Sequence, residues 1–457
     1  MIRSFTSFLF FAALALGEPA DWIVTARYVV TMDGARRVIE NGAVAVRGER
    51  VAAAGPRADI LKRFQAKQQL DRPHAILLPG LVNAHAHAPM SLLRGIADDL
   101  KLQEWLEKYI FPAEAKNVNP EFVRWGTRLA CLEMALGGVT TYADMYYFEE
   151  VVAEATKEAG LRGVLGETII DFPVPDAKTP AEGLARTEAF LRRFQRDPLI
   201  VPAVAPHAPY TNTEATLKAC RALANRYGVP LLIHLSETRT ENDESRAKWH
   251  MSPAQWLDKL GVFDGKTLVA HAVWLDETDR GILRRCATGV AHCPSSNTKL
   301  ASGIAPVVAM LEAGLAVGLG TDGPAGSNND FNLFEEMDLA AKLQKVTTGN
   351  PRALPARQAI EMATILGAKA VFLDREIGSL ETGKRADLIT VAIDQPHAVP
   401  MYDVYSQLVY ALKASDVRDV MVNGKLIVRE GRSLTLNQAA ILAKAEEFRA
   451  RIAASLQ

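Results

Sequence analysis

The sequence of 457 residues predicts an α/β fold, a (β/α)8 barrel joined to a small β-sandwich built from both ends of the chain. Two observations lead to this prediction. Between about Leu78 and Ile377, short apolar strands alternate with helical stretches, which is the rhythm of a parallel sheet. On both sides of this block the sequence is rich in short β segments. We assign residues 1–17 to a signal peptide, 78–377 to the barrel, and 18–77 with 378–457 to the sandwich and a C-terminal helix.

The first 17 residues have the features of a secretory signal peptide. Arg3 precedes an apolar segment, residues 5–16, and the small residue Gly17 follows it. The apolar segment is shorter than the roughly 20 residues that a membrane-spanning helix needs. We therefore expect a periplasmic or secreted protein, or a cytoplasmic one if the segment is not functional as a signal.

The predicted sandwich takes strands from both termini. Near the N-terminus, segments 28–32, 43–46 and 51–54 are separated by turns such as Asn41-Gly42. Near the C-terminus, segment 386–391 is followed by 417–428, which contains the hairpin signal Asn423-Gly424. Residues 446–456 are predicted to form a closing amphipathic helix.

The central block contains eight strand candidates, the number that a (β/α)8 barrel requires. They cover residues 76–87, 139–145, 163–169, 200–207, 229–237, 267–274, 289–297 and 316–323. An open doubly wound sheet would normally show a glycine-rich phosphate turn after its first strand, and the sequence has none there.

The first of these strands ends in a pair of histidines, His85 and His87. On an extended backbone residues two apart point to the same side, so both imidazoles face one way. Such a pair suits a divalent ion such as Zn²⁺, provided that other parts of the chain supply further ligands. The motif alone is equally compatible with two ordinary polar histidines at a strand end.

Other polar residues occur at the predicted ends of strands four to eight. They are His207, His234 with Glu237, His271, His292 and Asp322. An isolated histidine of this kind is more often a hydrogen-bonded core residue. Because the strand ends of a barrel meet at one face, their joint occurrence favours a metal-dependent active site.

Six motifs in this order resemble the metal-dependent amidohydrolase superfamily, in particular its aminohydrolase branch with the 5-methylthioadenosine/S-adenosylhomocysteine deaminases. They are HAHAPM, PHAPYT, HLSET, AHAVWL, HCPSSN and GTDGPAGSNN. The resemblance covers essentially the whole chain after the predicted signal. It implies one metal ion held by His85, His87, His234 and Asp322, and catalytic roles for Glu237, His271 and Asp322. Zn²⁺ is expected, although Fe²⁺ and Mn²⁺ also suit these ligands.

The chemistry that this resemblance implies is hydrolytic deamination. The metal lowers the pKa of a bound water, and Asp322 accepts the proton of that water. Glu237 protonates a ring nitrogen, and His271 orients the attacking oxygen and stabilises developing charge. Glu237 follows His234 by three residues, which would aim it across a regular strand, so we expect the strand to end near His234 and the chain to turn.

The resemblance also suggests residues that contact the substrate. Glu114 matches the position that binds ribose hydroxyls, Trp105 lies where a side chain can wall a planar base, and His207 matches a nucleoside contact. Members that accept S-adenosylhomocysteine bind its carboxylate with an arginine after strand three. An ungapped alignment puts Glu167 at that place, so we expect this chain to disfavour S-adenosylhomocysteine.

The leading functional hypothesis is therefore deamination of an adenine nucleoside such as 5′-methylthioadenosine or adenosine. The alternative is a deaminase or dechlorinating hydrolase of a free heterocycle, a purine base or a triazine, for which Glu114 would have no ribose to bind. A non-catalytic metal-binding protein is the third hypothesis. The balance of 52 Lys and Arg against 53 Asp and Glu, without a long basic run, argues against nucleic-acid or membrane partners after signal removal. A homo-oligomer is expected.

Overall fold

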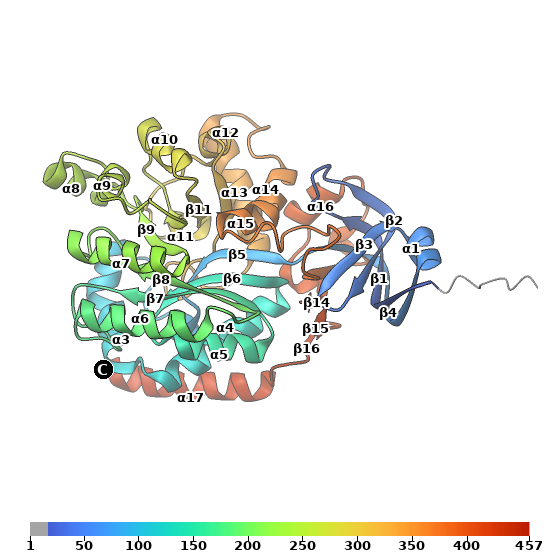
Figure 1. Ribbon diagram of the computed structural model, residues 1–457, viewed down its shortest axis with the longest axis horizontal. Helices are drawn as coiled ribbons and strands as arrows, with labels where there is room; N and C mark the ends of the chain where they lie inside the picture. The colour runs from blue at the N-terminus through green and yellow to red at the C-terminus, as the bar shows by residue number, and fades with distance from the viewer. Residues whose placement is uncertain (1–16, 457) are drawn as a thin grey trace, which may run out of the picture.

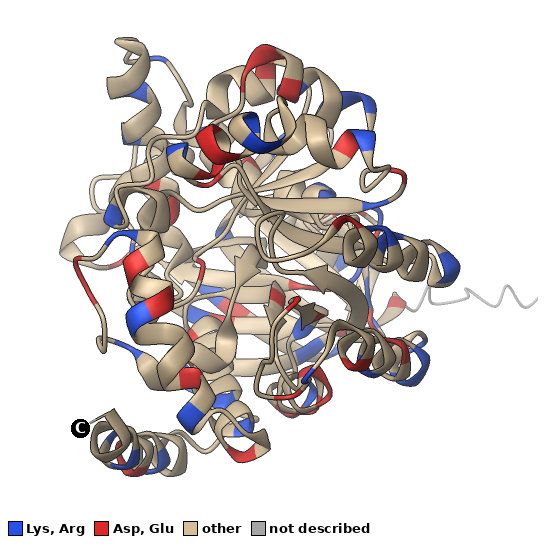
Figure 2. Cartoon of the chain, turned by 90° about the vertical axis from the view of Figure 1, so that its left-hand side faces the viewer, with Lys and Arg blue, Asp and Glu red and all other residues tan. Residues whose placement is uncertain are grey.

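The computed structural model describes residues 17–456, so the predicted signal peptide, apart from Gly17, lies outside the described residues. Figure 1 shows a barrel surrounded by helices, with a smaller sheet at one side. Basic and acidic residues are mixed on the outer helices in the view of Figure 2, in keeping with the even balance of charge.

A closed barrel of eight parallel strands forms the centre of the molecule and confirms the predicted fold class. Its strands are β5 (Leu81–Ala86), β6 (Val139–Tyr146), β7 (Arg162–Ile169), β8 (Ile200–Pro206), β9 (Leu231–Leu235), β10 (Thr267–His271), β11 (Gly289–His292) and β12 (Ala316–Leu319). Small and branched apolar side chains fill the barrel interior, among them Val82, Val164 and Leu232.

Helices connect and cover these strands. They are α2 (Leu102–Trp105), α3 (Phe111–Asn117), α4 (Pro120–Leu136), α5 (Glu149–Ala159), α6 (Pro180–Phe194), α7 (Glu214–Tyr227), α8 (Arg239–Trp249), α9 (Pro253–Lys259), α10 (Glu277–Arg285), α11 (Pro294–Lys299), α12 (Val307–Glu312), α13 (Leu333–Thr348), α14 (Ala356–Ala363) and α15 (Ile365–Ala370). Several of these helices begin with a polar N-cap residue whose side chain accepts backbone N–H groups of the first turn. The side chain of Asn119, for example, accepts the N–H of Glu121 and of Phe122 before α4.

The chain leaves the smaller sheet and enters the barrel at Gly80, in the middle of the first predicted barrel strand. Residues before it belong to β4 (Phe64–Pro79), which pairs with β13 (Leu388–Ala392), and residues after it form β5. A Cβ atom at Gly80 would lie 2.1 Å from Oγ1 of Thr140. The prediction of one continuous strand over residues 76–87 is therefore wrong. The chain forms two strands that meet at Gly80, where there is no room for a side chain.

Both chain ends build the smaller sheet, as predicted, and their strands join in one mixed sheet of eight. The order is β16-β15-β14-β13-β4-β1-β2-β3, with β1 (Glu18–Val30), β2 (Val38–Arg47), β3 (Arg50–Pro56), β14 (Val417–Val422), β15 (Lys425–Arg429) and β16 (Arg432–Ser433). The short helix α1 (Arg57–Arg63) links β3 and β4. The N–H of Val51 in β3 donates to the carbonyl of Lys384, in the segment before β13, at 2.9 Å, so the N-terminal and C-terminal parts of the chain are also bonded to each other outside the strand pairing.

The C-terminal helix α17 (Gln438–Leu456) lies along the barrel, away from the sheet (Figure 1). Phe448 packs edge-to-face on Phe122 of α4, with ring centroids 5.9 Å apart. The sequence grouped this helix with the sandwich, but its apolar side chains are buried against the barrel. The helix α16 (Val404–Tyr410) also packs on barrel helices, α13 and α14.

A buried ion pair ties the sheet to the N-terminal ends of the barrel strands. Nη2 of Arg162, the first residue of β7, lies 3.1 Å from Oδ2 of Asp387 and 2.5 Å from Oδ1 of Asn423. Over the described part of the chain, no helix is both long and apolar enough to span a bilayer.

Candidate metal and catalytic centre

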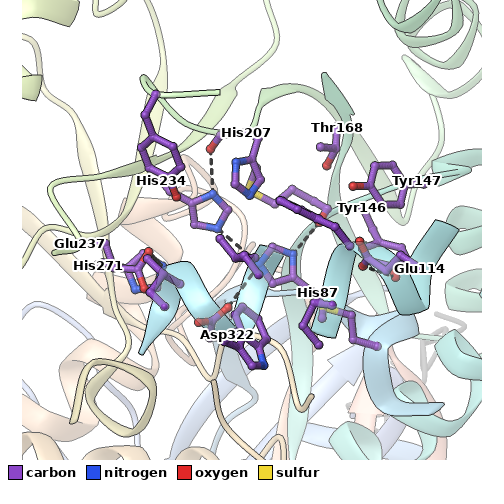
Figure 3. Close-up of a pocket in the computed structure, with 18 residues that line it drawn as sticks. His87, Glu114, Tyr146, Tyr147, Thr168, His207, His234, Glu237, His271 and Asp322 are labelled. Carbon is purple, nitrogen blue, oxygen red and sulfur yellow. Dashed lines mark hydrogen bonds and ion pairs between the residues drawn. The ribbon is translucent and has the colours of Figure 1, made fainter. Parts of the chain in front are cut away.

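A cavity of about 560 Å³, its open mouth included, lies at the C-terminal ends of the barrel strands (Figure 3). Six residues that the sequence predicted as ligands or reacting groups line it or lie at its floor: His85, His87, His234, Glu237, His271 and Asp322. Trp105 and Glu114 also line the cavity.

The predicted metal ligands converge at the floor of this cavity. Oδ1 of Asp322 lies 3.4 Å from Nε2 of His85 and 3.2 Å from Nε2 of His87. Nε2 of His234 lies 3.3 Å from Nε2 of His87. Four side chains from three strand ends thus present one donor atom each to a common point.

The hydrogen bonds behind these rings show that the donor atoms suit a cation. Nδ1 of His87 lies 2.7 Å from the carbonyl oxygen of Met145, and Nδ1 of His234 lies 2.7 Å from that of His207. Each Nδ1–H therefore donates outward, and Nε2 is the ring nitrogen that faces the centre. Nε2 of His85 is buried and has no hydrogen-bond partner within residues 17–456. Such a set of facing ring nitrogens fits a divalent ion of the zinc type.

Charge at the centre favours the same interpretation. Burial lowers the pKa of His234 well below its usual value, and it lowers the pKa of His85 to about 4, so both rings are neutral ligands. Burial also opposes protonation of His87, but the carboxylate of Asp322 outweighs it and raises the pKa of His87 to about 9. The cluster therefore attracts positive charge.

Asp322 follows β12 in a left-handed backbone conformation, with φ of 65°. Its Oδ1 accepts the N–H of Gly323 at 2.7 Å, and its Oδ2 accepts the hydroxyl of Ser296 at 2.6 Å. Burial opposes ionisation of Asp322, but the adjacent rings of His85 and His87 keep its pKa well below the usual value. Asp322 is therefore held as a carboxylate.

Glu237 and His271 lie together on one side of the centre. Strand β9 ends at Leu235, and Ser236 has φ of 50°, so the chain turns where the spacing predicted. Oε2 of Glu237 then lies 3.8 Å from Nε2 of His271. Nδ1 of His271 lies 3.0 Å from Oδ1 of Asn297. Burial raises the pKa of Glu237, which helps it to retain a proton for transfer.

The remaining wall of the cavity carries the predicted substrate contacts. Glu114 of α3 accepts a 2.7 Å hydrogen bond from the hydroxyl of Tyr146, and burial raises the pKa of Glu114 to about 7. Nε1 of Trp105 donates to the carbonyl of Ala325 at 2.8 Å, which fixes the indole in the wall. His207 lies opposite, and burial lowers its pKa to about 3, so its ring is neutral.

The prediction that Glu167 faces the substrate is wrong. Its neighbour Thr168 lines the cavity, and successive residues of a strand point to opposite faces, so Glu167 points outward to the helices. There its carboxylate accepts the N–H of Glu149 at 2.9 Å and lies 3.3 Å from Nε of Arg186. No Lys or Arg lines the cavity in the described part of the chain.

Comparison with known proteins agrees with this geometry. The pattern of the amidohydrolase family matches residues 76–427. The chain belongs to the amidohydrolase family. It is 44% identical over 440 residues to 5-methylthioadenosine/S-adenosylhomocysteine deaminase 1 of Syntrophus aciditrophicus (strain SB), covering 96% of this chain and 99% of that one. It is 43% identical to 5'-deoxyadenosine deaminase of Methanosarcina acetivorans, covering 93% and 97% of the two chains.

A solved structure is also closely similar to this amidohydrolase. The crystal structure of an adenosine deaminase from Xanthomonas campestris with bound zinc superposes with a TM-score of 0.94 at 40% identity, covering 96% of this chain and 100% of the other.

Sequence reasoning missed several residues of this amidohydrolase site. Tyr146 and Tyr147 line the cavity, and nothing in their local sequence marks them as site residues. Tyr210 also lines it and lies within the recognised motif PHAPYT, so that motif could have singled it out. Ser296 and Asn297, which bond to Asp322 and His271, lie within the recognised motif HCPSSN, so the motif could have singled them out.

Proposed function

We propose that this amidohydrolase is a zinc-dependent hydrolytic deaminase of adenine nucleosides. The observation that carries the proposal is the convergence of His85, His87, His234 and Asp322 beside Glu237 and His271 in one cavity. Relatives at 43–44% identity are named as deaminases of adenine nucleosides, and the zinc-containing structure at 40% identity is an adenosine deaminase.

His85, His87, His234 and Asp322 would hold the ion through their inward-facing donor atoms. When bound, a divalent ion supplies Lewis-acid chemistry and lowers the pKa of water in its coordination sphere from 15.7 to about 7. The protein fixes the rings of His87 and His234 through outward hydrogen bonds, so their donor atoms need little rearrangement.

The chain supplies the proton transfers. The carboxylate of Asp322 accepts a proton from the attacking water, and Glu237 in its protonated form donates to the ring nitrogen beside the amino-bearing carbon. His271, with Nδ1–H bonded to Asn297, presents Nε2 to the reacting atoms and orients the water. Attack forms a C–O bond. The proton that Asp322 accepted then passes to the amino group, and cleavage of the C–N bond releases ammonia, so nucleoside and water give the hydroxyl-substituted nucleoside and ammonia.

The cavity also indicates which nucleosides fit. Glu114 is placed to accept ribose hydroxyls, and Trp105 provides a flat wall for the base. Since no cation lines the cavity within residues 17–456, the carboxylate of S-adenosylhomocysteine would lack a partner. We therefore propose a preference for neutral 5′ groups, as in adenosine or 5′-methylthioadenosine. This preference does not involve Glu167, which points away from the cavity.

Ammonia release with a substrate panel tests the proposal. The zinc-loaded enzyme should deaminate adenosine and 5′-methylthioadenosine with a higher kcat/KM than S-adenosylhomocysteine, and should leave adenine, guanine and a chlorotriazine almost unchanged. Higher efficiency with a free base or triazine would favour the heterocycle hydrolase instead. Equal efficiency with S-adenosylhomocysteine would contradict the preference for neutral groups.

We also propose that the protein acts in the periplasm or outside the cell. Arg3, the apolar residues 5–16 and Gly17 support this proposal. Protein isolated from its source should begin at or near Glu18, as N-terminal sequencing would reveal. Intact Met1 in a cytoplasmic fraction would contradict export.

The expected association into homo-oligomers remains a prediction. Light scattering coupled to size exclusion tests it, since a monomeric mass at micromolar concentration would contradict it.

A further inference from the structure

A second buried glutamate, Glu241, lies directly behind Glu237. It belongs to the first turn of α8 and is 8% exposed. Its Oε1 accepts the N–H of Ser236 at 2.9 Å, and its Oε2 accepts the N–H of Glu237 at 2.7 Å. These two backbone donors are the hydrogen-bond partners of its carboxylate among the described residues. One carboxylate thus clamps the turn that carries the proposed acid.

This turn requires such a clamp because it is strained. Ser236 has φ of 50°, a left-handed conformation that a residue with a side chain keeps only where the surrounding structure holds it. The carbonyl of Ser236 accepts the N–H groups of Val273 and Trp274, each at 3.0 Å. Those residues follow His271, which is itself left-handed with φ of 71°. The turns that carry Glu237 and His271 are therefore joined to each other and anchored by Glu241.

The local sequence explains how Glu241 reaches the turn. Thr238 caps α8, and its hydroxyl accepts the N–H of Glu241 at 3.1 Å. In the usual capping box a glutamate three residues after the cap returns to the N–H of the cap residue. Here it passes the cap and binds the two preceding N–H groups instead.

We propose that Glu241 is a positioning residue for the deamination reaction. Its carboxylate holds the turn so that the carboxyl group of Glu237 stays beside Nε2 of His271, 3.8 Å away, and faces the ring nitrogen of the substrate. This inference rests on the proposed function.

Glu241→Gln is the sharpest substitution, because it keeps the size of the side chain. Glutamine retains one acceptor oxygen, but its NH₂ group would face the other backbone N–H. One of the two hydrogen bonds is then replaced by a repulsive contact between two donors. We expect kcat to fall roughly 10- to 100-fold, since a misplacement of about 1 Å at a reacting group can cost 10² in rate. KM and zinc content should stay near the wild-type values.

A double-mutant cycle with Glu237 distinguishes positioning from general structural support. The Glu237→Gln variant has no acid for Glu241 to position. Adding Glu241→Gln to it should therefore change kcat by less than about twofold. Losses that multiply, or a loss of zinc in Glu241→Gln, would overturn the proposal. Glu241→Asp keeps both oxygens but is shorter, and should recover part of the activity if it regains one of the two bonds.

Asp279 provides a matched control on the next barrel helix, α10. It is also buried near a helix start, where it accepts the N–H of Asp276 at 3.2 Å and the hydroxyl of Ser252 at 2.5 Å. It does not line the cavity. Asp279→Asn should lower Tm and leave kcat unchanged. An equal fall of kcat in Asp279→Asn would overturn the assignment of a specific role to Glu241.

The failure of this inference and of the proposed function can be told apart. If wild-type enzyme releases no ammonia from any nucleoside, the proposed function fails. Amide hydrogen exchange in residues 232–240 still tests the clamp, because Glu241→Gln should accelerate exchange at Ser236 and Glu237 while Asp279→Asn should not. Unchanged exchange in Glu241→Gln would overturn the proposal.

Discussion

The two ends of the barrel differ in how their buried charged groups are paired. At the N-terminal end, where the barrel meets the sheet, Arg162 is bonded to Asp387 and Asn423. At the C-terminal end, ring nitrogens face one another and a carboxylate, and Nε2 of His85 has no hydrogen-bond partner in the part of the chain described. Left-handed residues also gather there, Ser236, His271 and Asp322 among them.

This difference separates groups that hold the fold from groups kept ready for a ligand. Buried charges in native proteins are normally paired, so ring nitrogens and a carboxylate that face one another without a cation point to a missing positive charge or a reacting molecule. Strained backbone is stored at functional sites when the surrounding structure supports it. Substitutions at the catalytic end should therefore change metal content or rate, and substitutions at the joint should change stability.

Removal of a metal ligand gives the largest expected effect and most directly tests the catalytic end. In His234→Ala the site loses one of its four donor atoms, so zinc content should fall and ammonia release should drop to background. Elemental analysis and the ammonia assay check this. One equivalent of zinc retained in His234→Ala, and likewise in His85→Ala, His87→Ala and Asp322→Ala, would contradict the ligand assignment.

Replacing the proposed acid separates rate from metal binding within the same end. Glu237→Gln should keep zinc and Tm but lose about 10²- to 10⁴-fold in kcat, the range for a positioned acid-base group. That corresponds to about 3–5 kcal/mol in the barrier. A zinc-loaded variant with wild-type kcat would show that Glu237 transfers no proton in the slow step.

At the opposite end, Arg162→Met should affect stability alone. Breaking a buried ion pair leaves Asp387 uncompensated, which costs about 3–5 kcal/mol. Urea unfolding measures this, and kcat per zinc-loaded molecule should not change. The exposed pair of Arg27 and Glu40 is the control, because Arg27→Met should cost less than about 1 kcal/mol. Similar costs for the two variants would contradict the distinction between the joint and the surface.

The smallest expected effect concerns the wall of the cavity. Burial raises the pKa of Glu114 to about 7, so its carboxyl is largely neutral below pH 7 and ionised above. A carboxylate binds ribose hydroxyls more strongly, by about 1 kcal/mol, so KM for adenosine should fall roughly fivefold from pH 6 to 8. Steady-state kinetics check this. The same pH dependence of KM in Glu114→Gln would contradict a ribose contact through Glu114.

The raised pKa of Glu114 also makes the stability of the folded protein depend on pH. Because the pKa of Glu114 in the folded protein lies above its ordinary value of 4.5, the folded state binds more protons between these values. The contribution of Glu114 to stability therefore decreases as pH rises from 4.5 to about 7. Urea titrations of wild type and Glu114→Gln across this range measure it, and identical pH slopes would contradict the shift.

The sequence by itself determined the fold class and the identity of the convergent residues. A His-x-His pair on an extended strand places both rings on one side, and parallel strands of a barrel bring their ends to one face. These rules are local or follow from the repeating unit. They predict that the polar residues at the strand ends meet at one face, and the resemblance to the amidohydrolases then implied His85, His87, His234 and Asp322 as the ligands.

Only the tertiary structure decided which side of each strand or helix faces the cavity and which side packs on other elements. Glu167 points away from the cavity because closure of the barrel selects Thr168 as the inward residue. Ser296 meets Asp322, and Trp105 meets Ala325, across long stretches of chain. The helix α17 packs on the barrel because the apolar surface that it covers is built by α3 and α4. Such contacts join residues remote in sequence, and no local pattern encodes the direction from which a distant partner arrives.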